Sequence, residues 1–441
     1  MSEKITLENG CVKKLFFKFA IPSVIGMLIV SMQMMVDGIF LSSAVGPDGL
    51  AAVNLSMPAI NLIMSIALMI SIGGGVLAGI AKGNNNHKRS EGLTTLTFVI
   101  LVGVLITISI IALINFKHVT NFLGVTKDIY PYVKPYLSIM LAGSTFFNLV
   151  IFTETFVRVN GKPNMVFISG LVCFLSNVIL DYLLIMVLGM GMEGAAIATT
   201  FANMFGCLAL ISQVKFGPIQ GNMEDIKNIF YNGSSEMLTT VSSAVTTYIF
   251  NLVLMKNIGI LGVSALTIVF YINSIINVSL YGLSQALQPI ISYNIGAKRL
   301  DKINSVLKIS FISGAIIGGV TFLAMQFFSS DIVDLFADGN KELETLTKNA
   351  IFFITFSYLI SFINIIASSF HTAIEKPFES AFISLGRSII FIIIPLMILP
   401  VIFGNTGIWL ATPTAELLCL ALSIPLTLKS LTHLKRRLIL N

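Results

Sequence analysis

Two acidic residues, Asp37 and Asp181, stand inside long apolar runs of the sequence. A carboxylate within a membrane-length apolar run is costly, so its presence points to a function. Asn177 precedes Asp181 by four residues, which places both side chains on the same face of a helix. Carboxylate and amide oxygens are hard ligands, which suit Na⁺ or a proton rather than a soft metal ion. These residue types therefore predict a cation site.

The predicted depth of these residues brings them together. The apolar runs 15–44 and 163–187 cross the membrane in the same direction, so both aspartates lie about 28 Å from one membrane face. Folding the chain back at the glycine turns on either side of the second run brings more polar side chains to that depth. The predicted cation site contains Asp37, Tyr136, Asn177, Asp181 and Thr199; if the ion is Na⁺, its ligands are Asp37, Asn177, Asp181 and Thr199.

The residues leave the identity of the ion open. Two neighbouring carboxylates could share a proton, and together with Asn177 and Thr199 the same pair could hold Na⁺. A polar network that only pins helices together is the structural alternative. Apart from the coupling ion, no cofactor is expected.

Other charged residues in apolar runs are weaker candidates. Glu154 precedes Arg158 by one helical turn, so it either pairs with that arginine or contacts the cation or substrate. Glu236 lies near the start of its span, where it either contacts the cation or substrate or faces cytoplasmic water. Arg387 and Glu416 lie in neighbouring spans and are expected to pair.

Methionines crowd the first apolar run. Soft, adaptable side chains suit a cavity that accepts many ligands, so Met27 and Met34 are candidate substrate contacts. Ordinary packing or lipid-facing methionine is the alternative for each.

The composition determines the elements that must position these residues. Hydrophobic residues make up 55% of the 441-residue chain and charged residues 11%, roughly half the usual share for a soluble domain. Long apolar runs without alternation exclude an outer-membrane barrel. We predict an all-α polytopic membrane protein with twelve transmembrane helices in two pseudo-symmetric six-helix bundles. The spans are 15–44, 50–80, 92–115, 131–157, 163–187, 193–214, 230–256, 262–293, 305–328, 346–371, 377–402 and 406–428.

The basic residues predict the orientation. Most of the 27 Lys and Arg residues fall in tails and loops on one side of these spans, together with both termini. The positive-inside rule makes that side cytoplasmic, so the net charge of +6 reflects topology in the cell membrane rather than a nucleic-acid partner.

The chain contains a duplicated half. A shift of about 213 residues aligns Gly46 with Gly259 and Gly83 with Gly296, and the basic loops repeat with the same spacing. A parallel repeat of six spans predicts two bundles with a cleft suited to alternating access. We expect an N-terminal lobe over 1–215, a cytoplasmic linker over 216–229 and a C-terminal lobe over 230–441.

The repeat also shows that the predicted cation site occurs in one half only. Residues of the site and Glu154 align with residues that cannot replace them: Asp37 with Phe250, Asn177 with Phe391, Asp181 with Pro395, Thr199 with Pro413 and Glu154 with Ser368. A purely architectural network would be needed in both halves, so this asymmetry favours a single functional site.

Enzyme motifs are missing from the sequence. It contains no GxxxxGK[ST], HExxH or GxSxG pattern, its four histidines are dispersed, and its four cysteines form no CxxC pair. We therefore expect a protein that is not an enzyme and that draws its energy from an ion gradient or from a partner.

The whole chain resembles the MATE (multidrug and toxic compound extrusion) family, in its bacterial DinF-like and MepA-like branch. The motifs that carry this resemblance are Ala20-Ile21-Pro22 with Val36-Asp37, Asn160-Gly161-Lys162-Pro163, Asn177-Val178-Ile179-Leu180-Asp181, the run 189–196 and the run 288–297. The resemblance implies two six-helix lobes, drug antiport against Na⁺ or H⁺, and an N-lobe cation site at the residues named above. Tyr182 and Ser235 depart from it, because many relatives have proline there, and both positions bear on helix bending.

The expected function is cation-coupled export of amphipathic, often cationic drugs by alternating access. A flippase for lipid-linked precursors is the first alternative; it needs fixed cations for a pyrophosphate, and only Arg387 lies deep. A channel or structural membrane subunit is the second. The expected partners are small-molecule drugs and the lipid bilayer, without nucleic acid, and the expected state is a monomer.

Overall fold

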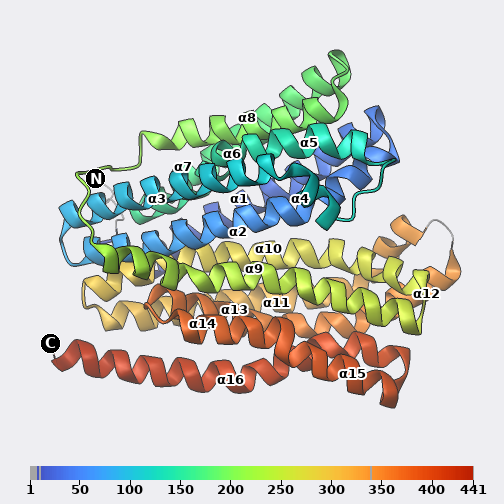
Figure 1. The fold of residues 1–441 in the computed structure, drawn as a ribbon. Helices are drawn as coiled ribbons and strands as arrows, with labels where there is room; N and C mark the ends of the chain where they lie inside the picture. The colour runs from blue at the N-terminus through green and yellow to red at the C-terminus, as the bar shows by residue number, and fades with distance from the viewer. Residues whose placement is uncertain (1–6, 9–10, 338–339, 441) are drawn as a thin grey trace. The chain divides into compact units, whose positions relative to one another are not determined.

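The computed structural model describes residues 7–8, 11–337 and 340–440, and within these ranges the chain is helical almost throughout, with no strand. Short turns connect most of the helices, and a longer irregular segment joins α8 to α9 (Figure 1). The α-helices are α1 (Val12–Ala44), α2 (Pro47–Gly83), α3 (His87–Ile114), α4 (Phe116–Phe122), α5 (Tyr130–Ala142), α6 (Ser144–Val159), α7 (Pro163–Asp181), α8 (Gly191–Ile211), α9 (Met223–Asn257), α10 (Ile260–Gly296), α11 (Leu300–Ala337), α12 (Lys341–Ile354), α13 (Tyr358–Ala373), α14 (Pro377–Leu385), α15 (Phe391–Phe403) and α16 (Asn405–Leu440).

Three segments depart from α-helical geometry: the first ends the span Pro163–Val187, and the other two each join two helices of one span. Tyr182–Val187 and Gly386–Ile390 are π-helical, and Thr355–Ser357 is a 3₁₀ turn. The first follows Asp181 directly, and the second contains Arg387. Both π segments therefore adjoin charged residues that the sequence places inside the membrane.

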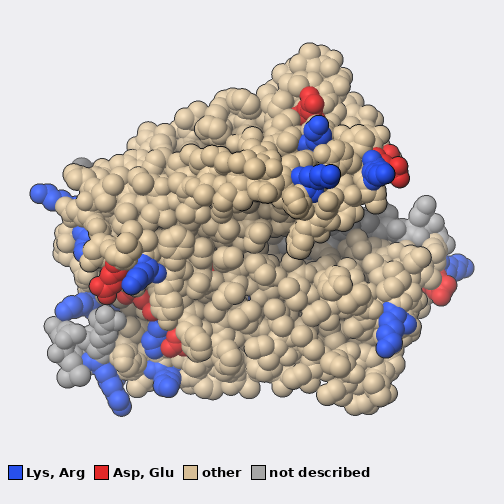
Figure 2. Space-filling view, viewed as in Figure 1, with Lys and Arg blue, Asp and Glu red and all other residues tan. Residues whose placement is uncertain are grey.

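The helices agree with the predicted spans. Among the described residues, ten helical segments are long and apolar enough to cross a membrane, and a bent pair of helices forms an eleventh. The one remaining predicted span, 262–293, coincides with α10, whose described apolar stretch is Ile260–Phe270. The charged side chains visible in Figure 2 lie near the ends of each bundle, with an uncharged band between them.

The bent pair is the predicted span 131–157, which breaks at Gly143. The axes of α5 and α6 differ by 49° there. A Gly-Ser pair is a usual cause of such a kink, and Ser144 follows this glycine. A Cβ atom at Gly143 would lie only 2.9 Å from the Thr200 hydroxyl oxygen on α8, so the close approach of these helices requires glycine.

By its contacts the chain divides into two compact units, which are described separately below. The first contains Met1–Gly10 and Phe17–Met237, and the second contains Cys11–Phe16 and Leu238–Asn441. The predicted lobe boundaries at 215 and 230 stay a prediction.

In the first unit, α2 packs against α3, α5 and α6, and α8 packs against α5, α6 and α7. Small residues let the backbones approach, as in many membrane bundles. The segment between α8 and α9 is joined to α3, because Thr95 Oγ1 donates a 2.7 Å hydrogen bond to the Gly217 carbonyl. The first turn of α9 is joined to α3 as well, since Arg89 pairs with Asp225 at 2.9 Å.

In the second unit, α13 is central and packs against α10, α11, α14 and α16. The indole of Trp409 on α16 is fully buried in its core. This bundle also carries the groove and the charged network described below.

Candidate functional site

Asn177 and Asp181 lie one turn apart in the last part of α7. The helix begins at Pro163, whose fixed φ angle and missing N–H group suit the first helical position. Both polar side chains are fully buried. Directly after Asp181 the helix widens into the π-helical segment Tyr182–Val187, a distortion that is common at functional sites. Tyr182 therefore occupies an irregular turn although it is not a proline.

Asp37 joins these two residues from α1. Its half-buried carboxyl lies within interaction range of both Asp181 and Asn177. The equal depths predicted from the sequence are therefore matched by proximity in the fold.

Several buried polar atoms of this cluster lack hydrogen-bond partners. Five of its buried side-chain atoms have no hydrogen-bond partner: Asp37 Oδ1, Asn177 Nδ2, Asn177 Oδ1, Asp181 Oδ1 and Asp181 Oδ2. Each buried polar atom without a partner costs about 1–3 kcal/mol, and more if it is charged. Most buried polar groups in proteins are satisfied. Several unsatisfied oxygens at one place therefore fit a site that a cation completes.

The donor set fits a hard ion or a proton. Carboxylate oxygens and one amide oxygen converge here, without sulfur or imidazole. Among the described residues, no group of three or more His, Cys, Asp or Glu side chains could hold a metal ion. When bound, Na⁺ or a proton would supply the positively charged partner that is not described for either aspartate.

The sequence-predicted Tyr136 lies beside this cluster. It is 6% exposed on α5, and both aspartates act electrostatically on its phenol. Met140, one turn further along α5, is equally buried. The break at Gly143 follows, so the kink determines how the end of α5 packs against α8.

Thr199 is less clearly part of the site. It is half-buried on α8, and its carbonyl accepts a 2.8 Å hydrogen bond from Asn203 Nδ2. In the part of the chain that the structure describes, no hydrogen bond joins its hydroxyl to either aspartate. Its role as a ligand stays a prediction.

The neighbouring Thr200 was not identified from the sequence. Its hydroxyl donates to the Ala196 carbonyl at 2.8 Å and lies 3.9 Å from the sulfur of Met140. It therefore links α8 to α5. The side chain of Thr200 also packs directly against Gly143. The spacing of the two threonines in the sequence indicates neither contact.

Asn148 on α6 was also missed. It is 1% exposed, its amide donates to the Ser144 carbonyl at 2.8 Å, and its Oδ1 has no partner. An amide in the middle of a predicted span was the available signal.

The remaining candidate residues differ in their partners and in their exposure. Glu154 pairs with Arg158 at 3.2 Å, which is the simpler of its two predicted roles. Glu236 is half-buried on α9 and Met27 is half-buried on α1, whereas the Met34 side chain is 59% exposed. Substrate contact by these residues stays a prediction.

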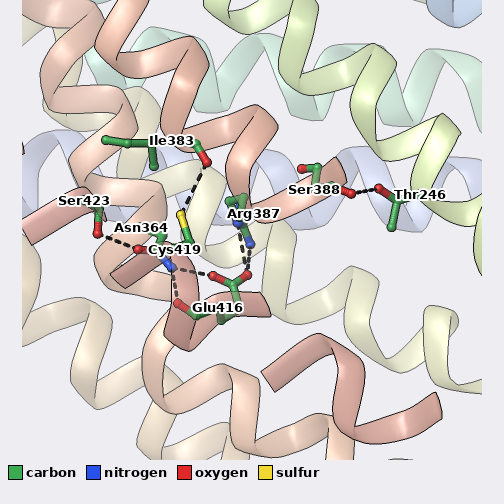
Figure 3. Close-up of polar contacts among 8 residues, drawn as sticks. All are labelled: Thr246, Asn364, Ile383, Arg387, Ser388, Glu416, Cys419 and Ser423. Carbon is green, nitrogen blue, oxygen red and sulfur yellow. Dashed lines mark hydrogen bonds and ion pairs between the residues drawn. The ribbon is translucent and has the colours of Figure 1, made fainter. Parts of the chain in front are cut away.

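The second unit contains a different polar cluster (Figure 3). Arg387 donates from Nε and Nη2 to Glu416 Oε1 at 3.0 and 2.6 Å, which confirms the predicted pair. Asn364 donates to Glu416 Oε2 at 2.6 Å, and Ser423 donates to Asn364 Oδ1 at 2.6 Å. Near this pair, Thr246 donates to the Ser388 carbonyl. Each of these bonds stays within the second unit.

Comparison with known proteins places the chain in a family. The sequence profile of the family described as MatE matches residues 22–183 and again residues 236–398. The chain belongs to the MatE family. Two matches of one MatE profile also agree with the duplication inferred from the sequence.

Curated MatE relatives match nearly the whole chain. Multidrug export protein MepA from Staphylococcus aureus (strain bovine RF122 / ET3-1) is 22% identical over 421 residues, which cover 93% of this chain and 92% of the relative. MepA from Staphylococcus haemolyticus is 24% identical over 426 residues, which cover 95% and 93%.

Solved structures show the same fold. The Vibrio cholerae MATE transporter VcmN, in a mutant form, aligns with a TM-score of 0.90 at 19% identity over 96% of this chain and 97% of that one. A MOP superfamily transporter from Pyrococcus furiosus aligns with a TM-score of 0.90 at 20% identity over 98% and 100%. The predicted polytopic fold and the resemblance to MATE transporters are confirmed, and the protein is a multi-pass membrane protein of a transporter family rather than an enzyme.

Proposed function

We propose that this protein is an antiporter that exports amphipathic, often cationic small molecules and is driven by inward movement of Na⁺ or H⁺. It acts in the cytoplasmic membrane with both termini in the cytoplasm, the side that the positive-inside rule gives to its basic loops. The observation that carries the proposal is the group of five unpartnered buried atoms on Asp37, Asn177 and Asp181.

The two carboxylates, which have no described positive partner, can couple ion binding to drug release. Two buried acidic side chains with no described ion pair are destabilising when both are ionised, and a cation relieves that repulsion. The ion therefore favours the state of the transporter in which this cluster is closed around it. A drug that binds the other state better shifts the same equilibrium in the opposite direction, so ion entry and drug release are linked.

The substrate class rests on the relatives. The curated matches are named multidrug export proteins, and they cover more than nine-tenths of this chain. The methionine-rich α1, with Met27 half-buried and Met34 exposed, supplies adaptable side chains of the kind that varied ligands need.

The flippase alternative is weaker. A cavity for a lipid-linked pyrophosphate needs available cationic side chains, but the deep Arg387 already donates twice to Glu416. A pyrophosphate at this arginine would leave Glu416 without its partner, which is costly for a buried charge.

The test is ethidium efflux from loaded proteoliposomes under an imposed Na⁺ or pH gradient. We expect efflux under one gradient and its loss to the gradient-free rate in Asp181→Asn and Asp37→Asn. Asp128→Asn is the matched control, because Asp128 is an exposed acid between α4 and α5. Wild-type coupled efflux by Asp181→Asn would refute the site, and absence of efflux under both gradients would refute the antiporter.

A further inference from the structure

An apolar groove lies between three helices of the second unit. Its volume is about 490 Å³, comparable with that of a small-molecule site. It is lined from α11, α13 and α16 by Phe311, Ile312, Ala315, Phe362, Ile363, Ala367, Ser423, Ile424, Thr427, Leu428 and Leu431.

The groove has a buried floor and an exposed rim. Phe362 and Thr427 are less than a tenth exposed, whereas Ile312 and Leu428 are 51% and 59% exposed. All three helices contain membrane-spanning segments, so the exposed rim lies at a depth where the solvent is hydrocarbon. An acyl chain is therefore the available apolar occupant.

Basic side chains mark one end of the groove. Lys308 precedes Ile312 by four residues on α11, and Lys435 follows Leu431 by four residues on α16. Residues four apart share a helix face, so each lysine continues a lining stripe by one turn. Both lysines are exposed, and no ion pair is described for either. Figure 2 shows basic side chains at the end of this unit where α16 ends.

A polar group lines the groove between its two extremes. Thr427 Oγ1 is buried without a hydrogen-bond partner. It lies about 12 Å along the helix from Lys435, since the two residues are eight positions apart. A phospholipid has the same order of groups, with an anionic phosphate at the surface, ester oxygens below it and acyl chains beneath.

We infer that this groove is a binding site for one anionic phospholipid. Its phosphate contacts Lys308 and Lys435, an ester oxygen accepts from Thr427, and an acyl chain fills the apolar floor. A drug-sized substrate is a poorer fit, because binding sites for such molecules place several polar groups at fixed positions, and this lining is almost entirely apolar.

The groove also reaches the charged network of its own bundle. Ser423 lines the groove and donates to Asn364, which in turn donates to Glu416. The lipid site is therefore one side chain away from the buried Arg387–Glu416 pair, and it does not depend on the antiport function proposed above.

The test is native mass spectrometry of the purified full-length protein with phosphatidylglycerol or phosphatidylcholine of identical acyl chains. We expect a preference for phosphatidylglycerol. Each basic residue near a membrane surface contributes about fivefold to binding of an anionic lipid, so Lys308→Gln/Lys435→Gln should lower its affinity about thirtyfold. Ala315→Phe, which adds bulk at the groove wall, should weaken both lipids equally.

Lys429→Gln is the matched control, because Lys429 is exposed on α16 but does not line the groove or continue its stripe. It should bind phosphatidylglycerol as the wild type does. The proposal fails if Lys429→Gln loses as much affinity as the double variant, because binding would then reflect surface charge. It fails equally if the two lipids bind alike, or if Ala315→Phe has no effect on either.

Discussion

The two units of this transporter each bury charge in the membrane, but they satisfy it in opposite ways. In the first unit, Asp37 and Asp181 face each other beside Asn177, with five atoms that lack hydrogen-bond partners. In the second, the carboxylate of Glu416 accepts from a guanidinium and from an amide, and neither Arg387 nor Glu416 has a buried side-chain atom among those found without a partner. The first arrangement fits the cation site proposed above, whereas the second pairs its charges without a ligand.

The repeat makes this difference more informative. With a shift of 214 residues, the paired charges of the second half align with apolar or weakly polar residues of the first: Arg387 with Cys173, Glu416 with Ala202, Asn364 with Val150 and Ser423 with Ala209. Each half has therefore lost or never gained the polar cluster of the other. One fold carries a polar cluster with unpartnered atoms in one copy and an internally paired cluster in the other.

The largest expected effect comes from breaking the Arg387–Glu416 ion pair. Glu416→Ala leaves Arg387 charged and unpaired in the bundle, which should lower the free energy of unfolding by about 3–5 kcal/mol. Arg387→Met/Glu416→Leu removes both charges and should be near wild type or more stable. Thermal unfolding in detergent measures both variants.

A surface pair in the same unit provides the control. Glu379 lies 3.6 Å from Lys376 with both side chains about a quarter exposed, so Glu379→Ala should change stability by about 1 kcal/mol or less. If Glu416→Ala is as stable as Glu379→Ala, the Arg387–Glu416 pair does not stabilise the second unit. If the double variant loses ion-driven efflux while remaining stable, the second cluster takes part in transport and the contrast between the units is lost.

The next effect is stabilisation of the protein by Na⁺ binding at the cluster of Asp37, Asn177 and Asp181. If Na⁺ is the coupling ion, NaCl at a hundred times its Kd should stabilise the wild type by about 2.7 kcal/mol over choline chloride of equal ionic strength. Asp37→Asn should abolish this stabilisation, and Arg387→Met/Glu416→Leu should keep it. Equal stability in both salts would exclude sodium and leave a proton as the ion.

Much of this contrast could be predicted from the sequence, for physical reasons. A carboxylate in hydrocarbon is conspicuous because it is costly, so Asp37, Asp181 and Glu416 were all identified, and helix rise alone placed the first two at one depth. The pairing of Arg387 with Glu416 followed from opposite charge in neighbouring spans. Spacing of this kind needs only the regularity of an α-helix.

Irregular geometry could not be predicted in the same way. The π-helical segments after Asp181 and around Arg387 rotate the direction in which the following side chains point. The helix propensities of the residues do not predict such segments. The contact of Thr200 with Met140 depends on the break at Gly143, which three-dimensional packing determines. Whether a buried polar atom has a partner is likewise a property of the packed bundle and not of the residue type.

The finest test compares two amides. Asn177 and Asn364 are both fully buried, but the side chain of Asn177 has no hydrogen-bond partner, whereas Asn364 bonds to Glu416 and Ser423. Substitution by alanine deletes the same volume at each site, so the cavity terms are similar and the difference reports the hydrogen bonds. Asn364→Ala should be less stable than Asn177→Ala by about 1–3 kcal/mol in the absence of Na⁺, because it leaves Glu416 Oε2 without its donor. Chemical or thermal unfolding of the two variants side by side measures this difference, and equal losses would show that the first cluster is as well satisfied as the second.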